Sequence, residues 1–157
     1  MNKISFLGWE NCIQLSNEQI ELILTIDVGP RIIHCGFVGD ENLFGTFPEE
    51  LGRSCGTEFR IYGGHRFWIA PEKMPRTYAP DNTAVTVEDH GAFVRFIAPV
   101  EDTTRVQKII DIAVDPHLAL VKLTHTLHNH NPWTVELAPW ALTVMAPGGT
   151  AVFPHPP

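Results

Sequence analysis

Closely spaced glycines and prolines are the sequence feature that most constrains the fold of this chain. The 157 residues include 12 glycines and 13 prolines, and these interrupt most stretches that are long enough to form a helix. Between them, apolar and polar residues alternate, as at Ile20, Leu22, Leu24 and Ile26. A period of two is typical of half-buried strands. The sequence therefore predicts an all-β protein with antiparallel strands.

The same pattern gives the expected strand positions. Strands are predicted at residues 10–16, 20–26, 31–37, 43–44, 84–88, 92–98, 105–114, 118–129, 134–145 and 150–153. Residues 48–82 are predicted to be irregular and are rich in side chains that can do chemistry. A long irregular segment inside a compact domain is often functional.

Charge and composition exclude several classes of protein. The chain has 11 basic and 18 acidic residues, a formal net charge of −7, which disfavours binding to nucleic acids and to anionic membranes. It has no apolar run of the ~18 residues that a membrane span needs, and its start does not resemble a signal peptide. The cysteines Cys12, Cys35 and Cys55 are odd in number and form no close pair. We therefore expect a cytoplasmic protein without a disulfide framework.

The segment from Tyr62 to Glu72 is the strongest candidate site in the sequence. Gly63 and Gly64 allow the backbone to approach a ligand closely or to adopt positive φ. Arg66 offers a planar set of donors for sugar hydroxyls or a carboxylate, and Trp68 offers an apolar face for a pyranose ring. His65 and Glu72 are candidates for proton transfer. The alternative is a structural loop in which Arg66 pairs with Glu72 and Trp68 fills the core.

Two residues outside this segment are further candidates for ligand contact. Trp140 follows Ala138 and Pro139 and suits stacking on a sugar, with a core position as the alternative. Arg31 either contacts the ligand or pairs with a carboxylate such as Asp27.

A group of histidines near the end of the 118–129 segment raises the possibility of a metal site. Because side chains alternate along a strand, His128 and His130 share a face that His125 does not. His128, His130 and Glu136 are similar to the His-x-His and Glu ligands of a cupin, which suit zinc, iron or nickel. The alternative is that these histidines face solvent beside a turn.

Four segments together resemble the galactose mutarotase-like superfamily, which contains the aldose 1-epimerases and the glucose-6-phosphate 1-epimerases. They are residues 25–33, 41–44, 61–68 and 127–140. The Gly-Gly-His-Arg-x-Trp-x-Ala-Pro-Glu sequence at residues 63–72 is similar to a loop of one branch of that group. The resemblance implies an antiparallel β-sandwich of the supersandwich type, with a sugar cleft on a concave sheet. Such domains are usually longer, so residues 1–157 are expected to be a single sandwich domain, incomplete at the C-terminal end.

The chain departs from the catalytic motifs of this superfamily. Residues 79–82 read Ala-Pro-Asp-Asn where the family carries a His-Gly-Phe-x-Arg motif, and Trp140 stands at the position of a second histidine. The catalytic glutamate of the family would lie beyond Pro157.

The resemblance implies a protein that binds a small sugar through Arg31, Tyr62, Arg66, Trp68 and Trp140. His65, Arg66, Trp68 and Trp140 are expected to line one concave surface. If the chain interconverts aldose anomers, His65 and Glu72 are the acid–base candidates, and the reaction needs no metal or organic cofactor. The alternatives are a sugar-binding module without turnover and a cupin-like metal protein that uses His128, His130 and Glu136.

Overall fold

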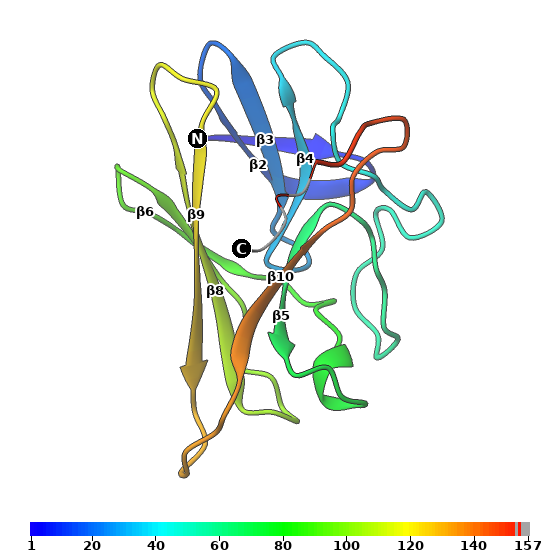
Figure 1. The fold of residues 1–157 in the computed structure, drawn as a ribbon, viewed down its shortest axis with the longest axis vertical. Coiled ribbons are helices and arrows are strands. Elements are labelled where there is room, and N and C mark those ends of the chain that lie inside the picture. The colour runs from blue at the N-terminus through cyan, green and yellow to red at the C-terminus, as the bar shows by residue number, and fades with distance from the viewer. Residues whose placement is uncertain (153, 155–157) are drawn as a thin grey trace.

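The fold is a β-sandwich of two antiparallel sheets (Figure 1). A computed structural model of the chain describes residues 1–152 and 154. Within these residues, the strand order is β1-β2-β3-β4-β5-β10 in one sheet and β6-β7-β8-β9 in the other. The prediction of an all-β antiparallel sandwich is confirmed.

The chain forms most of the first sheet, then the second sheet, and then returns to the first. The six-stranded sheet begins with β1 (Asn2–Phe6), β2 (Trp9–Ser16), β3 (Ile20–Thr25), β4 (Arg31–Phe37) and β5 (His65–Ala70). A 3-10 turn, η1 (Arg76–Tyr78), precedes the four-stranded sheet of β6 (Thr86–Asp89), β7 (Val94–Ile97), β8 (Val106–Val114) and β9 (Val121–Asn129). The chain then returns to the first sheet, where β10 (Ala138–Thr143) pairs with β5.

The main core lies between the two sheets. It consists of buried apolar residues from both sheets, among them Leu22, Ile32, Phe67, Phe96 and Ile110. We call the side of the six-stranded sheet that faces this core its inner face. Removal of these side chains from water supplies the main driving force for the packing of the sheets.

A second buried cluster covers the opposite side of the six-stranded sheet, which we call its outer face. Trp9, Cys12, Ile23, Ile33 and Tyr62 are buried there. The segment between β4 and β5 supplies Tyr62 and the half-buried Leu51 to this cluster. The outer face is therefore covered by irregular chain, whereas the inner face is covered by the second sheet.

The strand predictions differ from the structure mainly at β5. Residues 65–70 were expected to be irregular but form a strand between β4 and β10. His65 to Ile69 are all buried, so the polar–apolar alternation that marks a half-buried strand is absent. The predicted strand at 43–44 is only a single bridge from Phe44 to Met145.

The ends of the chain also differ from the predictions. The first strand, β1, was not expected, because Asn2 to Phe6 are mostly exposed and carry little apolar patterning. The predicted 134–145 strand begins only at Ala138, and residues 150–152 of the predicted 150–153 strand are not in a strand. Position 153 lies outside the described residues. In the part of the chain that is described, no helix is both long enough and apolar enough to span a membrane.

Candidate functional site

The alternation of side chains along β5 divides the predicted site residues between two faces of the sheet. Phe67 packs in the core between the sheets, and His65 contacts His125 of the facing sheet. Arg66 and Trp68 lie together on the outer face, with the guanidinium carbon of Arg66 4.0 Å from the ring centroid of Trp68. The structure therefore places His65 away from Arg66, Trp68 and Trp140, with which it was expected to share a surface.

Gly63 and Gly64 bring β5 into register with β4 by a close approach of backbone to backbone. Both residues have positive φ, 101° and 69°. A Cβ on Gly64 would lie 2.1 Å from the carbonyl oxygen of Ile32, and one on Gly63 would lie 2.2 Å from that of Gly45. These glycines therefore allow the chain to pack against itself.

A buried carboxylate joins the two arginines on the outer face. Arg31 and Arg66 are directly opposite each other on β4 and β5, and their side chains are almost fully buried. Asp81 Oδ2 accepts hydrogen bonds from Nη2 of Arg31 at 2.9 Å and from Nη2 of Arg66 at 3.4 Å. Burial by itself raises the pKa of Asp81, but the two guanidinium groups outweigh it and hold the pKa below its usual value.

The guanidinium groups of Arg31 and Arg66 therefore make their hydrogen bonds within the protein interior. Nη1 of Arg31 also donates to the carbonyl oxygens of Ile61 and Gly63. Burial lowers the pKa of Arg66 to about 9, which leaves it charged at neutral pH. Arg31 was expected either to contact a ligand or to pair with a carboxylate, and it pairs with Asp81.

Aromatic rings surround the outer side of Arg66. The aromatic cluster consists of Phe59, Trp68, Tyr78 and Trp140. The Trp68 ring contacts the other three, with centroid distances of 5.6 Å to Phe59, 5.5 Å to Tyr78 and 5.4 Å to Trp140. Trp68 and Trp140 are directly opposite each other on β5 and β10. The contacts of Trp68 with Tyr78 and Trp140 are edge-to-face, an arrangement that stabilises the cluster beyond the burial of its surface.

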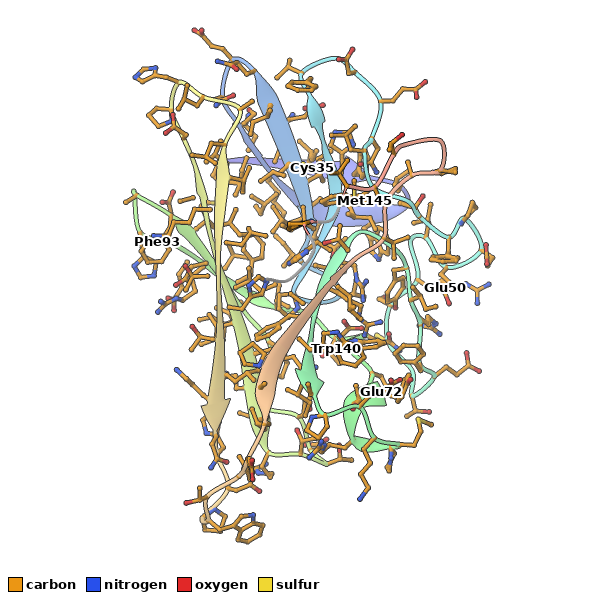
Figure 2. The ribbon with its side chains drawn as sticks, viewed as in Figure 1. Cys35, Glu50, Glu72, Phe93, Trp140 and Met145 are labelled. Carbon is orange, nitrogen blue, oxygen red and sulfur yellow. The ribbon has the colours of Figure 1, made fainter. Side chains whose placement is uncertain are left out.

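A shallow hollow of about 290 Å³ lies at the exposed edge of this cluster. Its lining residues are Ala70, Glu72, Pro139 and Trp140, and we call it the Trp140 hollow. Figure 2 shows Trp140, on β10, and Glu72, which follows β5, near each other in the lower half of the view. The carboxylate of Glu72 accepts a hydrogen bond from the hydroxyl of Tyr78. The hollow thus combines an indole surface with a carboxylate that is held in place.

Tyr62, which was expected to contact the sugar, belongs to the protein interior. It is completely buried, and its hydroxyl donates to Oδ1 of Asn82 at 2.9 Å. The guanidinium carbon of Arg31 lies 4.9 Å from the centre of the Tyr62 ring. Of the predicted site residues on the outer face, Trp140 and Glu72 line the hollow. The others, Arg31, Tyr62, Arg66 and Trp68, are buried and do not line it.

His65 occupies a separate environment between the sheets. Its Nε2 lies 2.9 Å from Nε2 of His125, and its Nδ1 lies 2.8 Å from the hydroxyl of Thr143. Burial, together with the neighbouring His125 and Arg31, lowers the pKa of His65 to about 4. The side chain is therefore a neutral imidazole at physiological pH.

The three residues of the cupin-like alternative are not gathered into a metal site. His128 and His130 are exposed, with ring centroids 6.5 Å apart, and Nε2 of His130 faces Oε1 of Gln107. Among the residues that the structure describes, no three or more histidine, cysteine, aspartate or glutamate side chains are close enough to hold a metal ion.

Sequence reasoning missed the roles of Asp81 and His125. Asp81 is 50 residues from Arg31 in the chain, and it follows a proline in a segment without periodic patterning. His125 meets His65 across two different sheets, so no strand register connects them. Only the inward position of His125, on the apolar side of its strand, could have indicated that it is part of the interior.

The chain has no recognisable relative in the comparisons with known proteins. No family model matches it, and neither the curated proteins nor the solved structures include a match.

Proposed function

We propose that this chain binds a neutral hexose sugar in the Trp140 hollow. The observation that carries the proposal is the combination of an indole surface and a fixed carboxylate, from Trp140 and Glu72, in one open hollow. The mutarotase-like resemblance of residues 63–72 and 127–140 points to the same class of ligand.

The chemistry of the hollow suits a sugar. The apolar C–H face of a pyranose can stack on an indole ring, and sugar hydroxyls can donate hydrogen bonds to a carboxylate. The 5.4 Å contact with Trp68 supports the Trp140 ring from behind, and the Tyr78 hydroxyl orients the carboxylate of Glu72. A ligand therefore meets groups that are already positioned, which lowers the entropic cost of binding.

The charges at the site favour neutral sugars over sugar phosphates. Glu72 is the charged residue that lines the hollow, and the guanidinium of Arg66 behind it is already paired with Asp81. The formal net charge of the whole chain is −7. A phosphate group would be repelled by Glu72, and the nearby guanidinium of Arg76 already donates to the carbonyl of Pro71.

The proposal is for binding without turnover. Epimerisation by ring opening needs an acid and a base on either side of one pyranose. His65 is on the inner face at the start of β5, and Glu72 follows the other end of the strand. At ~3.3 Å per residue, the two are roughly 20 Å apart, which is too far for one sugar ring.

The test is calorimetric titration of the chain with D-glucose, D-galactose and glucose 6-phosphate. We expect the neutral hexoses to bind and the phosphate to bind more weakly. Trp140→Ala should weaken hexose binding about five- to thirtyfold, equivalent to ~1–2 kcal/mol of lost stacking. The matched control is Trp133→Ala, because Trp133 is 65% exposed between β9 and β10 and does not line the hollow.

Equal affinities for wild type and Trp140→Ala would contradict the proposal, as would a loss of affinity in Trp133→Ala alone. Polarimetry on the same samples tests the absence of turnover. We expect the chain not to accelerate the mutarotation of either hexose.

A further inference from the structure

A pair of histidines connects the inner faces of the two sheets. His65 is on β5 of one sheet and His125 is on β9 of the other, and their Nε2 atoms are 2.9 Å apart. His65 is 7% exposed, and His125 is half-buried. The carbohydrate proposal makes no use of this pair.

The hydrogen bonds of the pair place a single proton between the two Nε2 atoms. Nδ1 of His65 is 2.8 Å from the hydroxyl of Thr143 on β10. A hydroxyl can accept a proton from Nδ1 or donate one to it, and in either case two neutral imidazoles share one Nε2–H.

A metal ion can replace that proton if the two rings also tilt so that both Nε2 lone pairs point at it. Zinc–nitrogen bonds of about 2.0–2.1 Å in a tetrahedral site place two ligand nitrogens about 3.3 Å apart, so the rings need to separate by only about 0.4 Å. When the ion binds, both imidazoles present Nε2 lone pairs and carry their protons on Nδ1. The displaced proton moves through solvent to Nδ1 of the same ring, so both imidazoles stay neutral and no proton is released. The hydroxyl of Thr143 then accepts from Nδ1 of His65, as outer-shell partners of metal-bound histidines do.

The histidine pair lies near one edge of the sandwich. β9 and β10 are edge strands of their sheets and contact each other (Figure 1), and Thr143 is exposed. Within the described residues, no third histidine, cysteine or carboxylate completes the set. Water or a small anion would have to supply two of the four positions, because this pair offers two protein ligands where catalytic zinc sites have three.

We propose that His65 and His125 form a two-imidazole binding site for a divalent late transition metal ion, with zinc as the physiological candidate. The ion links the two sheets at their open edge. The imidazole ligands suit zinc and copper and exclude magnesium and calcium, which prefer oxygen.

The test is a zinc titration at neutral pH, in which binding is measured by calorimetry and stability by the melting temperature. We expect one ion per chain and a higher melting temperature in zinc than in magnesium. His125→Gln should lower zinc affinity at least tenfold and remove the thermal shift. The matched control replaces the exposed histidines of the same region, His128→Ala with His130→Ala, and should leave affinity within twofold of wild type.

A measurement on the wild-type chain keeps the test independent of how the variants fold. Copper(II) is paramagnetic and should broaden the amide signals of Phe67 and Thr143 before those of Asn129 and Asn131. Three results would each overturn the proposal. One is that copper broadens the signals of Asn129 and Asn131 first. The others are that the variant without the exposed histidines loses zinc binding, or that the wild type does not bind zinc. Sugar binding by the His125→Gln variant is expected to be unchanged, because the Trp140 hollow is on the other face of the sheet.

Discussion

Asp81 holds together the buried charged groups on the outer face of the six-stranded sheet. Arg31 and Arg66 would otherwise present two positive charges directly opposite each other on neighbouring strands, which is destabilising. Asp81 forms ion pairs with both arginines and so reduces their mutual repulsion, and its backbone carbonyl also accepts from the amide of Gly29 at 2.8 Å. A single carboxylate therefore connects β4, β5 and the segment before β6.

Asp81→Asn should destabilise the protein strongly. The substitution removes the negative charge and leaves two buried guanidinium groups without a counter-ion, which typically costs about 3–5 kcal/mol. Urea denaturation followed by circular dichroism measures this loss. The control is Asp102→Asn, an exposed carboxylate whose loss should change the unfolding free energy by less than about 0.5 kcal/mol. Equal midpoints for the two variants would show that Asp81 does not hold the arginines.

His65 should make stability fall in mild acid. Its folded pKa of about 4 lies below the ordinary value of 6.5, so between these two pH values the unfolded chain binds more protons than the folded chain. Stability due to this neutral histidine is complete above about pH 6.5 and is lost as the pH falls towards 4, by about 3 kcal/mol. Urea midpoints across this range, measured with a metal chelator present, give the slope. His65→Gln should flatten it, and parallel slopes in the two proteins would contradict the expectation.

At the scale of elements, the placement of β5 decides the site. The strand lies between β4 and β10 and supplies Arg66 and Trp68 to one face and His65 and Phe67 to the other. Its start is fixed by Gly64, whose missing Cβ allows the chain to pass the carbonyl of Ile32. Any shift of β5 by one residue would exchange the two sets of side chains.

Gly64→Ala should therefore disrupt the fold more than a substitution at another glycine with positive φ. The new Cβ would lie 2.1 Å from a backbone oxygen, so β4 and β5 would have to separate. We expect a loss of at least about 3 kcal/mol, from the clash in addition to the ordinary strain of ~1–2 kcal/mol. Gly91→Ala is the matched control, because Gly91 has φ 75° but no atom within 4 Å of the added Cβ. Similar unfolding midpoints for both variants would show that the close approach does not matter.

The elements that could be predicted from sequence are those whose two faces differ. β8 has Ile110 and Ile112 towards the core and Asp111 outwards, and its position was anticipated closely. β3 was also anticipated, from the alternation of Leu22 with Glu21, although most of its residues on both faces are buried.

β5 was missed because both of its faces are buried, one by the second sheet and one by irregular chain. The contacts that β5 makes with its neighbours could not be predicted from the sequence for the same reason. Trp68 was identified as a possible sugar platform, but its burial against Phe59, Tyr78 and Trp140 depends on tertiary packing.

At the scale of the whole molecule, the two faces of the six-stranded sheet have different chemistry. The outer face carries a buried arginine–carboxylate group beneath an aromatic cluster that ends in the Trp140 hollow. The inner face carries the neutral histidine pair between the sheets. The sequence interpretation joined residues of both faces into one site because they are adjacent in the chain. Trp68 and Trp140 were expected to lie on one surface, and they are directly opposite each other because β10 pairs with β5.

The central claim, that a neutral hexose binds at Trp140, is tested most directly by the indole N–H signals of the four tryptophans in a nitrogen-15 NMR titration. Trp9 is an internal control because it is buried and its Nε1 donates to the carbonyl of Arg53, and Trp133 is the exposed control. The account predicts that D-glucose or D-galactose shifts the Trp140 signal in a saturable manner, shifts the Trp68 signal less, and leaves those of Trp9 and Trp133 in place. A Trp140 signal that does not move with either hexose, or that moves no more than the Trp133 signal, would contradict it.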